Sequence, residues 1–459
     1  MSSFNEVDLT KGSISKHLIS QSTPLLIGNL LYVGYNVINT LWVGNLLGSK
    51  EVAATAVSFL IVFVLISITN GATSATSILV SRYYGAKDMK MVEKVVNTSY
   101  SLFSVLGVVI ITAFIIFSDI PLKLMNTEGD ILKIASPYLK LSIISFFFMM
   151  LFIVLMSVLR GIGNTLTPML VLVLSTVINA ILDPILISGF GPFPKMGING
   201  AAVATIVAQS LALIFGFIYT YRKTPSVSFH LKEFSFDKRI LYQIIKIGFP
   251  ATIQQSLIAI SSTFVASIVN VFGPDATAAY GIAIRIDSVA VLPSMSIGMA
   301  VTNLCSQNLG ANKPERVTEL RKSGILLSLL VNAIIVIPCF IFAKNIISAF
   351  ISEPNVVSIG SEYLRIMCIG YSLFGIVYIC NGILNGAERT LYTMIYTLLC
   401  LWVIRVPFAS ILSKSHLGLT GIWISIVVSI AVTAIISSIL CFLDKWKKSY
   451  ACSTTHLMK

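Results

Sequence analysis

Asp183 is one of the few ionisable residues within the apolar stretches of this chain, in the segment VINAILDPILIS. Asn179 precedes it by four residues, which places both side chains on one face of a helix. Pro184 follows and removes a backbone donor, which frees a carbonyl nearby. A carboxylate, an amide oxygen and a free carbonyl suit a hard cation such as Na⁺, and a carboxylate among apolar groups is a candidate for reversible protonation. The alternative is that Asp183 lies near a helix end and is partly solvated.

Asp287 and Arg285 are the corresponding candidates in the second half of the chain, within YGIAIRID. At a spacing of two residues they do not face each other on a helix, so each needs a partner elsewhere or a water-filled cavity. Asp287 could attract a cationic substrate, or it could belong to a structural ion pair. The sequence leaves both interpretations open.

Uncharged polar residues inside other apolar runs are candidates for lining a substrate cavity or for hydrogen bonds between helices. The cavity prediction, which includes Asp287, also covers Asn36, Asn70, Gln255 and Asn381. Two further candidates are hinge residues, because a proline inside a helix breaks a backbone hydrogen bond and permits bending. These are Pro24 and Pro250.

The sequence shows no grouping of the residues that metal binding, disulfide formation or catalysis would need. The four histidines (His17, His230, His416 and His456) lie in tails or loops, and the seven cysteines, all in the second half, show no CxxC spacing. No phosphate-binding loop of the Walker type and no HExxH motif occurs. The sequence therefore predicts neither an enzyme nor a nucleotide-driven pump, and no cofactor or structural metal.

The composition indicates which type of secondary structure carries these candidate residues. Hydrophobic residues make up 56% of the 459 residues and charged residues only 11%, against about 25% charged in soluble domains. Such a chain needs lipid to cover its surface. The apolar runs are continuous over about 20 residues, as in membrane-spanning helices, and do not alternate as in barrel strands.

Twelve apolar runs are long enough to span a membrane. They lie at about 20–46, 52–80, 95–118, 135–159, 166–190, 198–221, 244–272, 277–304, 323–343, 358–384, 391–413 and 418–442.

The distribution of basic residues predicts the orientation of these spans. If the N-terminus is cytoplasmic, most lysines and arginines fall on the inner side, and the outer segments collect only Lys50, Lys123, Lys133, Lys195, Lys344 and Lys414. Both termini are thus predicted to be cytoplasmic, in a multi-pass protein of the plasma membrane. The net charge of +13 follows from this topology and does not indicate nucleic-acid binding.

The chain contains an internal repeat. A shift of 225 residues aligns Ser81–Lys87 (SRYYGAK) with Ser306–Asn312 (SQNLGAN), and Tyr138 with Tyr363. Pro24 aligns with Pro250 after a one-residue slip. Arg405 falls roughly at the repeat position of the Asn179–Asp183 region, so the two halves have diverged in role, and we suggest that Arg405 neutralises Asp287.

Each repeat holds six spans, so the two lobes have the same orientation and are related by a pseudo-two-fold axis along the membrane normal. We predict an all-α membrane protein with a lobe at 1–221, a cytoplasmic linker at 222–243, a second lobe at 244–442 and a basic cytoplasmic tail at 443–459. Parallel repeats of this kind occur in alternating-access transporters, whereas a channel more often assembles several copies around one pore.

Several segments resemble the multidrug and toxic compound extrusion (MATE) family over essentially the full chain. They are PLLIGNLLYVGYNVINTLWVGNLLG, SRYYGAKD, VLRGIGNTLTPM, ILDPILISGFGPFPKMGINGAAVAT, IGFPATIQQS, YGIAIRID, LPSMSIGMAV and SQNLGANKPERV. The resemblance implies two six-helix lobes around a central cavity. It also implies export of organic, often cationic, compounds against H⁺ or Na⁺.

The resemblance further implies a cation-coupling site in the first lobe. The family's asparagine and aspartate of the fifth span match Asn179 and Asp183, and its threonine of the sixth span matches Thr205. Its acid in the first span is replaced here by Asn39, which leaves Asp183 as the sole proton carrier. In another branch the seventh and tenth spans carry acids. This chain offers Gln254 and Gln255 in the seventh span and Asn381 in the tenth, so the sequence does not favour a second-lobe cation site of that type.

The sequence thus predicts a cation-coupled exporter of small organic compounds, embedded in membrane lipids and functional as a monomer. The coupling ion is H⁺ or Na⁺, and the lone carboxylate beside Asn39 leans to H⁺. Alternatives are a flippase for a lipid-linked precursor and an exporter of an endogenous metabolite. A cavity acid and twelve spans argue against the flippase.

Overall fold

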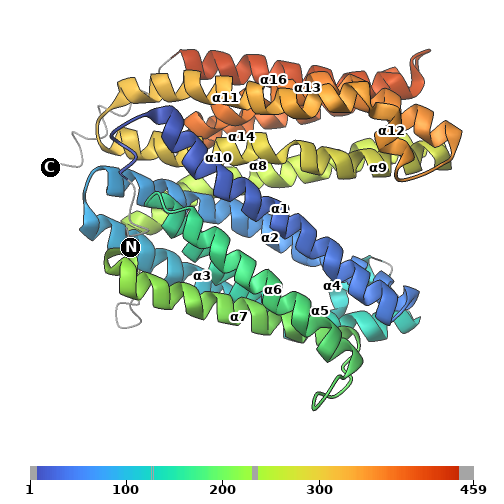
Figure 1. The fold of residues 1–459 in the computed structure, drawn as a ribbon, viewed down its shortest axis with the longest axis horizontal. Helices are drawn as coiled ribbons and strands as arrows, with labels where there is room; N and C mark the ends of the chain where they lie inside the picture. The colour runs from blue at the N-terminus through green and yellow to red at the C-terminus, as the bar shows by residue number, and fades with distance from the viewer. Residues whose placement is uncertain (1–7, 126, 128, 230–235, 444–459) are drawn as a thin grey trace. The chain divides into compact units, whose positions relative to one another are not determined.

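The computed structural model describes residues 8–125, 127, 129–229 and 236–443, without the side chains of residues 35–41, 49 and 226 (Figure 1). The described residues form helices and no strands. They divide into two compact units: unit 1 is Ile27–Thr252, and unit 2 combines Leu9–Leu26 with the residues from Ile253 onward. The predicted tail beyond residue 443 lies outside the described residues.

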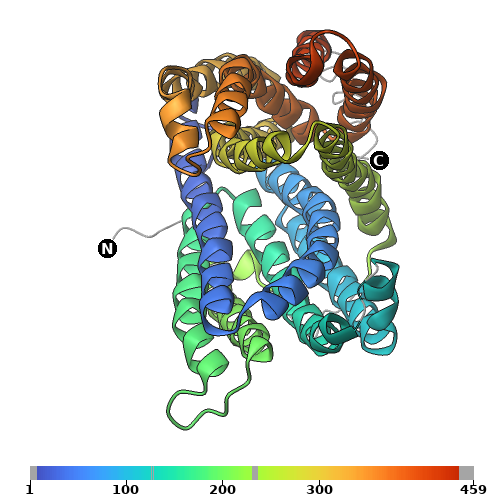
Figure 2. The ribbon, with the colours of Figure 1, turned by 90° about the vertical axis from the view of Figure 1, so that its right-hand side faces the viewer.

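Unit 1 is built from the second part of α1, six further α-helices, a short 3₁₀ turn and the start of α8. Their bounds are α1 Ile14–Leu46, α2 Ser49–Gly85, α3 Met89–Phe117, α4 Asp119–Leu124, α5 Gly129–Gly161, α6 Leu166–Ser188, α7 Ile198–Lys223, η1 Pro225–Val227 and α8 Lys238–Asn270. The α6–α7 hairpin, green in Figures 1 and 2, ends in the loop of residues 189–197.

Unit 2 continues from α8. Its other elements are α9 Pro274–Ala290, α10 Leu292–Gly310, α11 Pro314–Ile341, α12 Ala343–Ser348, α13 Pro354–Gly386, α14 Thr390–Leu398, the π-helical segment η3 Leu399–Arg405, α15 Val406–Ser413 and α16 Gly418–Phe442.

The predicted membrane spans agree with these helices. Among the described residues, eleven helical stretches are long and apolar enough to cross a membrane, and the 33-residue α1 corresponds to the first predicted span. Two spans are less regular than the sequence suggested. The eighth is interrupted at Val291, where Pro293 cannot donate a backbone hydrogen bond, and the eleventh contains η3 just before Pro407.

The internal repeat is visible in matching turns. Between α2 and α3, the N–H groups of Ala86 and Lys87 donate to the carbonyls of Arg82 and Tyr84. Between α10 and α11, the same bonds join residues 311 to 307 and 312 to 309. Lys87 and Asn312 both adopt left-handed backbone angles, with φ of 58° and 56°. One local fold therefore serves both repeats.

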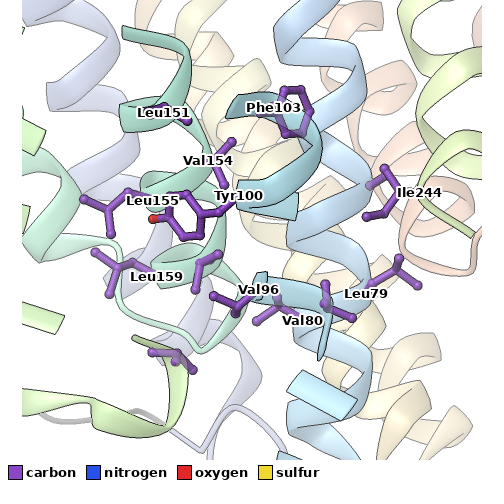
Figure 3. Close-up of a cluster of buried hydrophobic side chains, with 14 of the residues drawn as sticks. Leu79, Val80, Val96, Tyr100, Phe103, Leu151, Val154, Leu155, Leu159 and Ile244 are labelled. Atoms are coloured by element: carbon purple, nitrogen blue, oxygen red, sulfur yellow. The ribbon is translucent and has the colours of Figure 1, made fainter. Parts of the chain in front are cut away.

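Each unit has its own apolar core. In unit 1, α2, α3, α5 and the start of α8 bury one apolar cluster, which includes Leu79, Val96, Tyr100, Leu155 and Ile244 (Figure 3). In unit 2, the core includes Tyr280, Tyr363 and Trp423, and the indole ring lies 4.8 Å from the Tyr363 ring. These cores hold the helices that carry the candidate site residues.

Candidate functional site

The α6–α7 hairpin positions the predicted first-lobe site. α6 ends at Ser188 and is capped by Gly189, whose φ of 75° favours glycine and whose N–H donates to the Ile185 carbonyl. α7 begins against α6 because Gly200 has no side chain: a Cβ there would lie 2.6 Å from the carbonyl carbon and oxygen of Leu186. This close approach brings the first turns of α7 beside the last turns of α6.

The hairpin joins three of the four predicted coupling residues. Asn179 fits its surroundings when its amide nitrogen faces Asp183, where it donates to Oδ2 at 2.9 Å. Its amide oxygen then accepts from the Thr205 N–H at 3.2 Å and faces the Thr205 hydroxyl at 3.3 Å. Asn179 thus links the Asp183 carboxylate of α6 to the backbone of α7.

Asp183 is buried without a countercharge. Its side chain has 0% exposure, and in the part of the chain that the structure describes, no lysine or arginine forms an ion pair with it. The alternative interpretation, in which Asp183 is partly solvated, does not fit this burial. An ionised carboxylate in such surroundings is costly unless a cation or a proton neutralises it. This arrangement can therefore take up and release a positive charge.

Tyr138 is a neighbour of Asp183 that the sequence interpretation missed. It lies on α5, and its phenol is close enough to interact electrostatically with the Asp183 carboxylate. The repeat alignment had already paired Tyr138 with Tyr363, which was the available signal.

The predicted residues of α1 are less defined. The side chains of Asn36 and Asn39 lie outside the described residues, so their roles stay predictions. Val43, one turn after Asn39, is buried together with Ile187 of α6 and Ala201 of α7. The backbone of α1 therefore runs beside the hairpin that carries Asp183.

In unit 2, Asp287 is held by tyrosines rather than by an arginine. Tyr363 and Tyr371, two turns apart on α13, each donate a hydroxyl hydrogen bond to one oxygen of the half-buried Asp287 carboxylate. Arg405 instead donates from Nε to the Ser429 hydroxyl at 2.8 Å. Among the described residues Arg405 forms no ion pair with Asp287, although it is near enough to interact electrostatically. The suggested neutralisation is therefore indirect.

The repeat and the carboxylates give an unexpected correspondence. Tyr138 and Tyr363 occupy equivalent positions on α5 and α13, and each lies close to a carboxylate within the spans of its own unit. The carboxylates themselves come from non-equivalent helices, α6 for Asp183 and α9 for Asp287. In each unit a carboxylate therefore lies near this tyrosine position, and a different helix supplies it.

The other predicted cavity residues differ in burial. Asn70 on α2 and Gln255 on α8 are exposed. Asn381 on α13 is half-buried, and its Oδ1 atom has no hydrogen-bond partner among the described residues. Pro24 and Pro250 are buried within α1 and α8, which continue as helices through them. Their roles remain predictions.

The MatE family model matches the chain twice, over residues 24–185 and again over residues 250–411. The chain belongs to this family. The predicted resemblance and the two-lobe repeat are thereby confirmed. The two matches begin at Pro24 and Pro250.

Individual relatives agree with this family assignment. The probable multidrug resistance proteins YoeA and YpnP of Bacillus subtilis are each 31% identical to this chain. The YoeA alignment covers 93% of both chains, and the YpnP alignment covers 96% of this chain and 97% of YpnP. The solved structure described as the outward-facing conformation of a multidrug resistance MATE family transporter is 25% identical, with a TM-score of 0.89. It covers 98% of this chain and all of that one.

The family defines the general activity. MATE proteins are membrane transporters that use ion gradients, and relatives of this chain are named multidrug resistance and export proteins. The chain is therefore a multi-pass MATE transporter.

Proposed function

We propose that this MATE protein exports small organic, often cationic, compounds by antiport against an inward flow of H⁺ or Na⁺, with Asp183 as the coupling residue. Binding of the cation at Asp183 favours the arrangement of the lobes that releases substrate, and loss of the cation to the cytoplasm resets them. Coupling requires that the cation bind the two arrangements with different affinity.

One observation carries this proposal: the Asp183 carboxylate is completely buried and no cationic side chain of the described residues pairs with it. A group that must be neutralised by something from solution is a suitable coupling residue. Asn179 and Thr205 would hold the carboxylate in place as the charge changes, and the backbone of α1 near Asn39 completes the surroundings.

The lone carboxylate of this site favours H⁺ over Na⁺. Asn39 stands where the family resemblance implies an acid in the first span, and an asparagine cannot take up a proton, so Asp183 is the one proton carrier proposed for the site. We therefore propose proton coupling first, and Na⁺ as the alternative.

We propose that the polar side chains predicted from the sequence line the substrate cavity. Asp287 would attract a cationic group, because its carboxylate is half-buried and bonded only to tyrosine hydroxyls among the described residues. Asn36, Asn70, Gln255 and Asn381 would supply hydrogen bonds. Pro24 and Pro250 would permit α1 and α8 to bend as the cavity changes its opening.

The setting of this function follows from the sequence and the family. We propose a plasma-membrane protein with both termini in the cytoplasm, a cytoplasmic linker at 222–243 between lobes 1–221 and 244–442, and activity as a monomer in contact with lipids. Export of an endogenous metabolite fits the same site, because the coupling group does not select the substrate.

The test is efflux of ethidium from membrane vesicles with a pH gradient and a Na⁺ gradient imposed separately. We expect wild-type protein to respond to the pH gradient, and Asp183→Asn to respond to neither while still binding ethidium. Asp130→Asn is the matched control, since Asp130 is an exposed carboxylate of unit 1 paired with Lys50, and it should export normally. Full export by Asp183→Asn would reject Asp183 as the coupling residue.

A further inference from the structure

Two helices of this protein are shared between the compact units. α1 belongs to unit 2 up to Leu26 and to unit 1 from Ile27 onward, whereas α8 belongs to unit 1 up to Thr252 and to unit 2 from Ile253 onward. In both helices the change of unit comes two residues after the internal proline, Pro24 or Pro250. We call α1 and α8 the crossing helices.

The chain that leads into α1 is fixed to unit 2 by its backbone. Side chains at and beside the turn between α10 and α11 donate to three of its carbonyls. Asn308 donates to the Leu9 carbonyl at 3.3 Å, and Lys313 Nζ to the Thr10 carbonyl at 2.8 Å. Arg316 Nη2 donates to the Gly12 carbonyl at 3.0 Å. The remaining carbonyl, that of Lys11, lies 2.6 Å from Nε2 of His17. Every carbonyl from residue 9 to residue 12 therefore has a side-chain partner.

Apolar burial reinforces these bonds. Leu9, Ile14 and Leu18 have at most 1% of their surface exposed. Arg316 also donates from Nε to Oδ1 of Asn308 at 2.9 Å, so the residues that hold the incoming chain hold one another. The start of α1 is therefore held on unit 2 by side chains that are themselves hydrogen-bonded to one another.

The chain that leads into α8 is fixed to unit 1 in a comparable way. Lys94 of α3 forms an ion pair with Asp237 at 3.3 Å, and the N–H of Asp237 donates to the Thr98 hydroxyl. Asp237 also accepts from the N–H of Ile240, which caps α8. The Tyr83 hydroxyl donates to the Gln243 amide oxygen at 3.1 Å.

The two docked segments correspond through the repeat. Under the offset that relates Pro24 to Pro250, Ile14 and Leu18 match Ile240 and Ile244, and all four are buried.

The docking surfaces correspond as well. Tyr83 and Asn308, which match under the 225-residue offset, both contact the incoming chain. They stand in the SRYYGAK and SQNLGAN motifs, whose turns have the same backbone bonds. The repeated motif thus builds one docking surface in each unit.

We propose that these two turns, together with the start of the helix that follows each, at 83–98 and 308–316, are anchors for the crossing helices and that the strength of their contacts sets the balance between the transport states. Each anchor fixes the first part of a crossing helix to one unit, and the rest of the helix packs in the other unit. Any relative motion of the units must therefore bend or strain the crossing helix near its proline. This inference rests on the proposed alternating access, and it assigns to the repeated motif a mechanical role separate from ion binding.

The experiment is hydrogen–deuterium exchange of the full-length protein in lipid nanodiscs. Arg316→Ala removes the bond to the Gly12 carbonyl and the brace on Asn308. Lys322→Ala is its control, because Lys322 is an exposed cation on the same helix. Lys94→Ala weakens the other anchor, with exposed Lys90, one turn earlier on α3, as its control.

We expect amides of residues 13–19 to exchange about tenfold faster in Arg316→Ala, the effect of losing a hydrogen bond to a charged group. We also expect altered exchange at segments remote from the anchor, such as residues 46–53, and at least a threefold change in the initial rate of ethidium efflux. The control variants should match wild type in all three measurements.

Two results would overturn the inference. One is unchanged exchange at residues 13–19 in Arg316→Ala. The other is faster local exchange with normal remote exchange and normal efflux, which would make the anchor a static contact. If wild-type protein exports no ethidium under either gradient, the proposed function fails, and the remote exchange alone then decides whether the anchors control the arrangement of the units.

Discussion

Gly200 offers a direct test of how the candidate site is built, because it controls the distance between α6 and α7. A Cβ at this position would lie 2.6 Å from the carbonyl carbon and oxygen of Leu186 and 2.8 Å from the nitrogen of Ile187. These are backbone atoms, so no rotamer change relieves the contact. In Gly200→Ala, α7 must move away by roughly 0.8 Å to restore ordinary van der Waals contact.

This displacement has two consequences. Overpacking costs about 1–3 kcal/mol, which lowers the melting temperature by roughly 2–12 °C for a unit of this size. The bonds from Thr205 to the Asn179 oxygen, now 3.2 and 3.3 Å, would lengthen beyond hydrogen-bond range, while the Asn179–Asp183 bond within α6 survives. Proton-driven efflux should therefore fall more than ethidium binding does.

The assay pairs thermal unfolding of purified protein with efflux from vesicles. Gly34→Ala is the matched control, because a Cβ at this glycine of α1 meets no atom from elsewhere in the described part of the chain within 4 Å. It should unfold and export like wild type. If Gly200→Ala also retains wild-type melting temperature and efflux, close approach of α6 and α7 does not position the site, and the reasoning is wrong.

Three further substitutions test separate parts of the account. Asn179→Leu removes the donor to the buried carboxylate, a bond of about 1.5–3 kcal/mol, and efflux driven by a pH gradient should fall at least tenfold while ethidium binding in equilibrium dialysis persists. Tyr371→Phe removes one of the two hydroxyls that hold Asp287, so ethidium should bind several-fold more weakly; unchanged affinity would exclude Asp287 from the substrate site. Ser136→Ala removes the hydrogen bond that, more than any other contact, lowers the pKa of Asp119 below 3.8. A lowered pKa stabilises the fold above 3.8 and the effect is lost as pH falls through the folded value, so thermal unfolding should show a small deficit at pH 7 that disappears in strong acid.

Much of the fold could be predicted because lipid imposes a simple rule on sequence. Spans of about 20 apolar residues and a constant repeat offset gave both the helices and the two-lobe plan. The details that escaped prediction depend on backbone hydrogen bonds inside a span, such as the interruption at Val291 and the π-helical segment 399–405. A hydropathy profile detects neither feature, because neither changes how apolar the span is.

The candidate site likewise contains residues that the sequence predicted and residues that it did not. The pair Asn179 and Asp183 followed from helical spacing on one segment, whereas Thr205 came only from the family resemblance. Tyr363 and Tyr371 reach the Asp287 carboxylate from another helix, and no spacing within one helix encodes such contacts. The sharing of α1 and α8 between units was equally invisible, because it depends on which neighbours each half of a helix meets.

Proton movement coupled to substrate tests the central claim most directly. Purified protein would be reconstituted in vesicles that enclose a pH-sensitive dye, and ethidium would be added on the side from which it is exported while Na⁺ is absent. The account predicts that ethidium accelerates the collapse of an imposed pH gradient with wild-type protein and Asp130→Asn, and does not with Asp183→Asn. Ethidium-dependent proton flux through Asp183→Asn at the wild-type rate would contradict it.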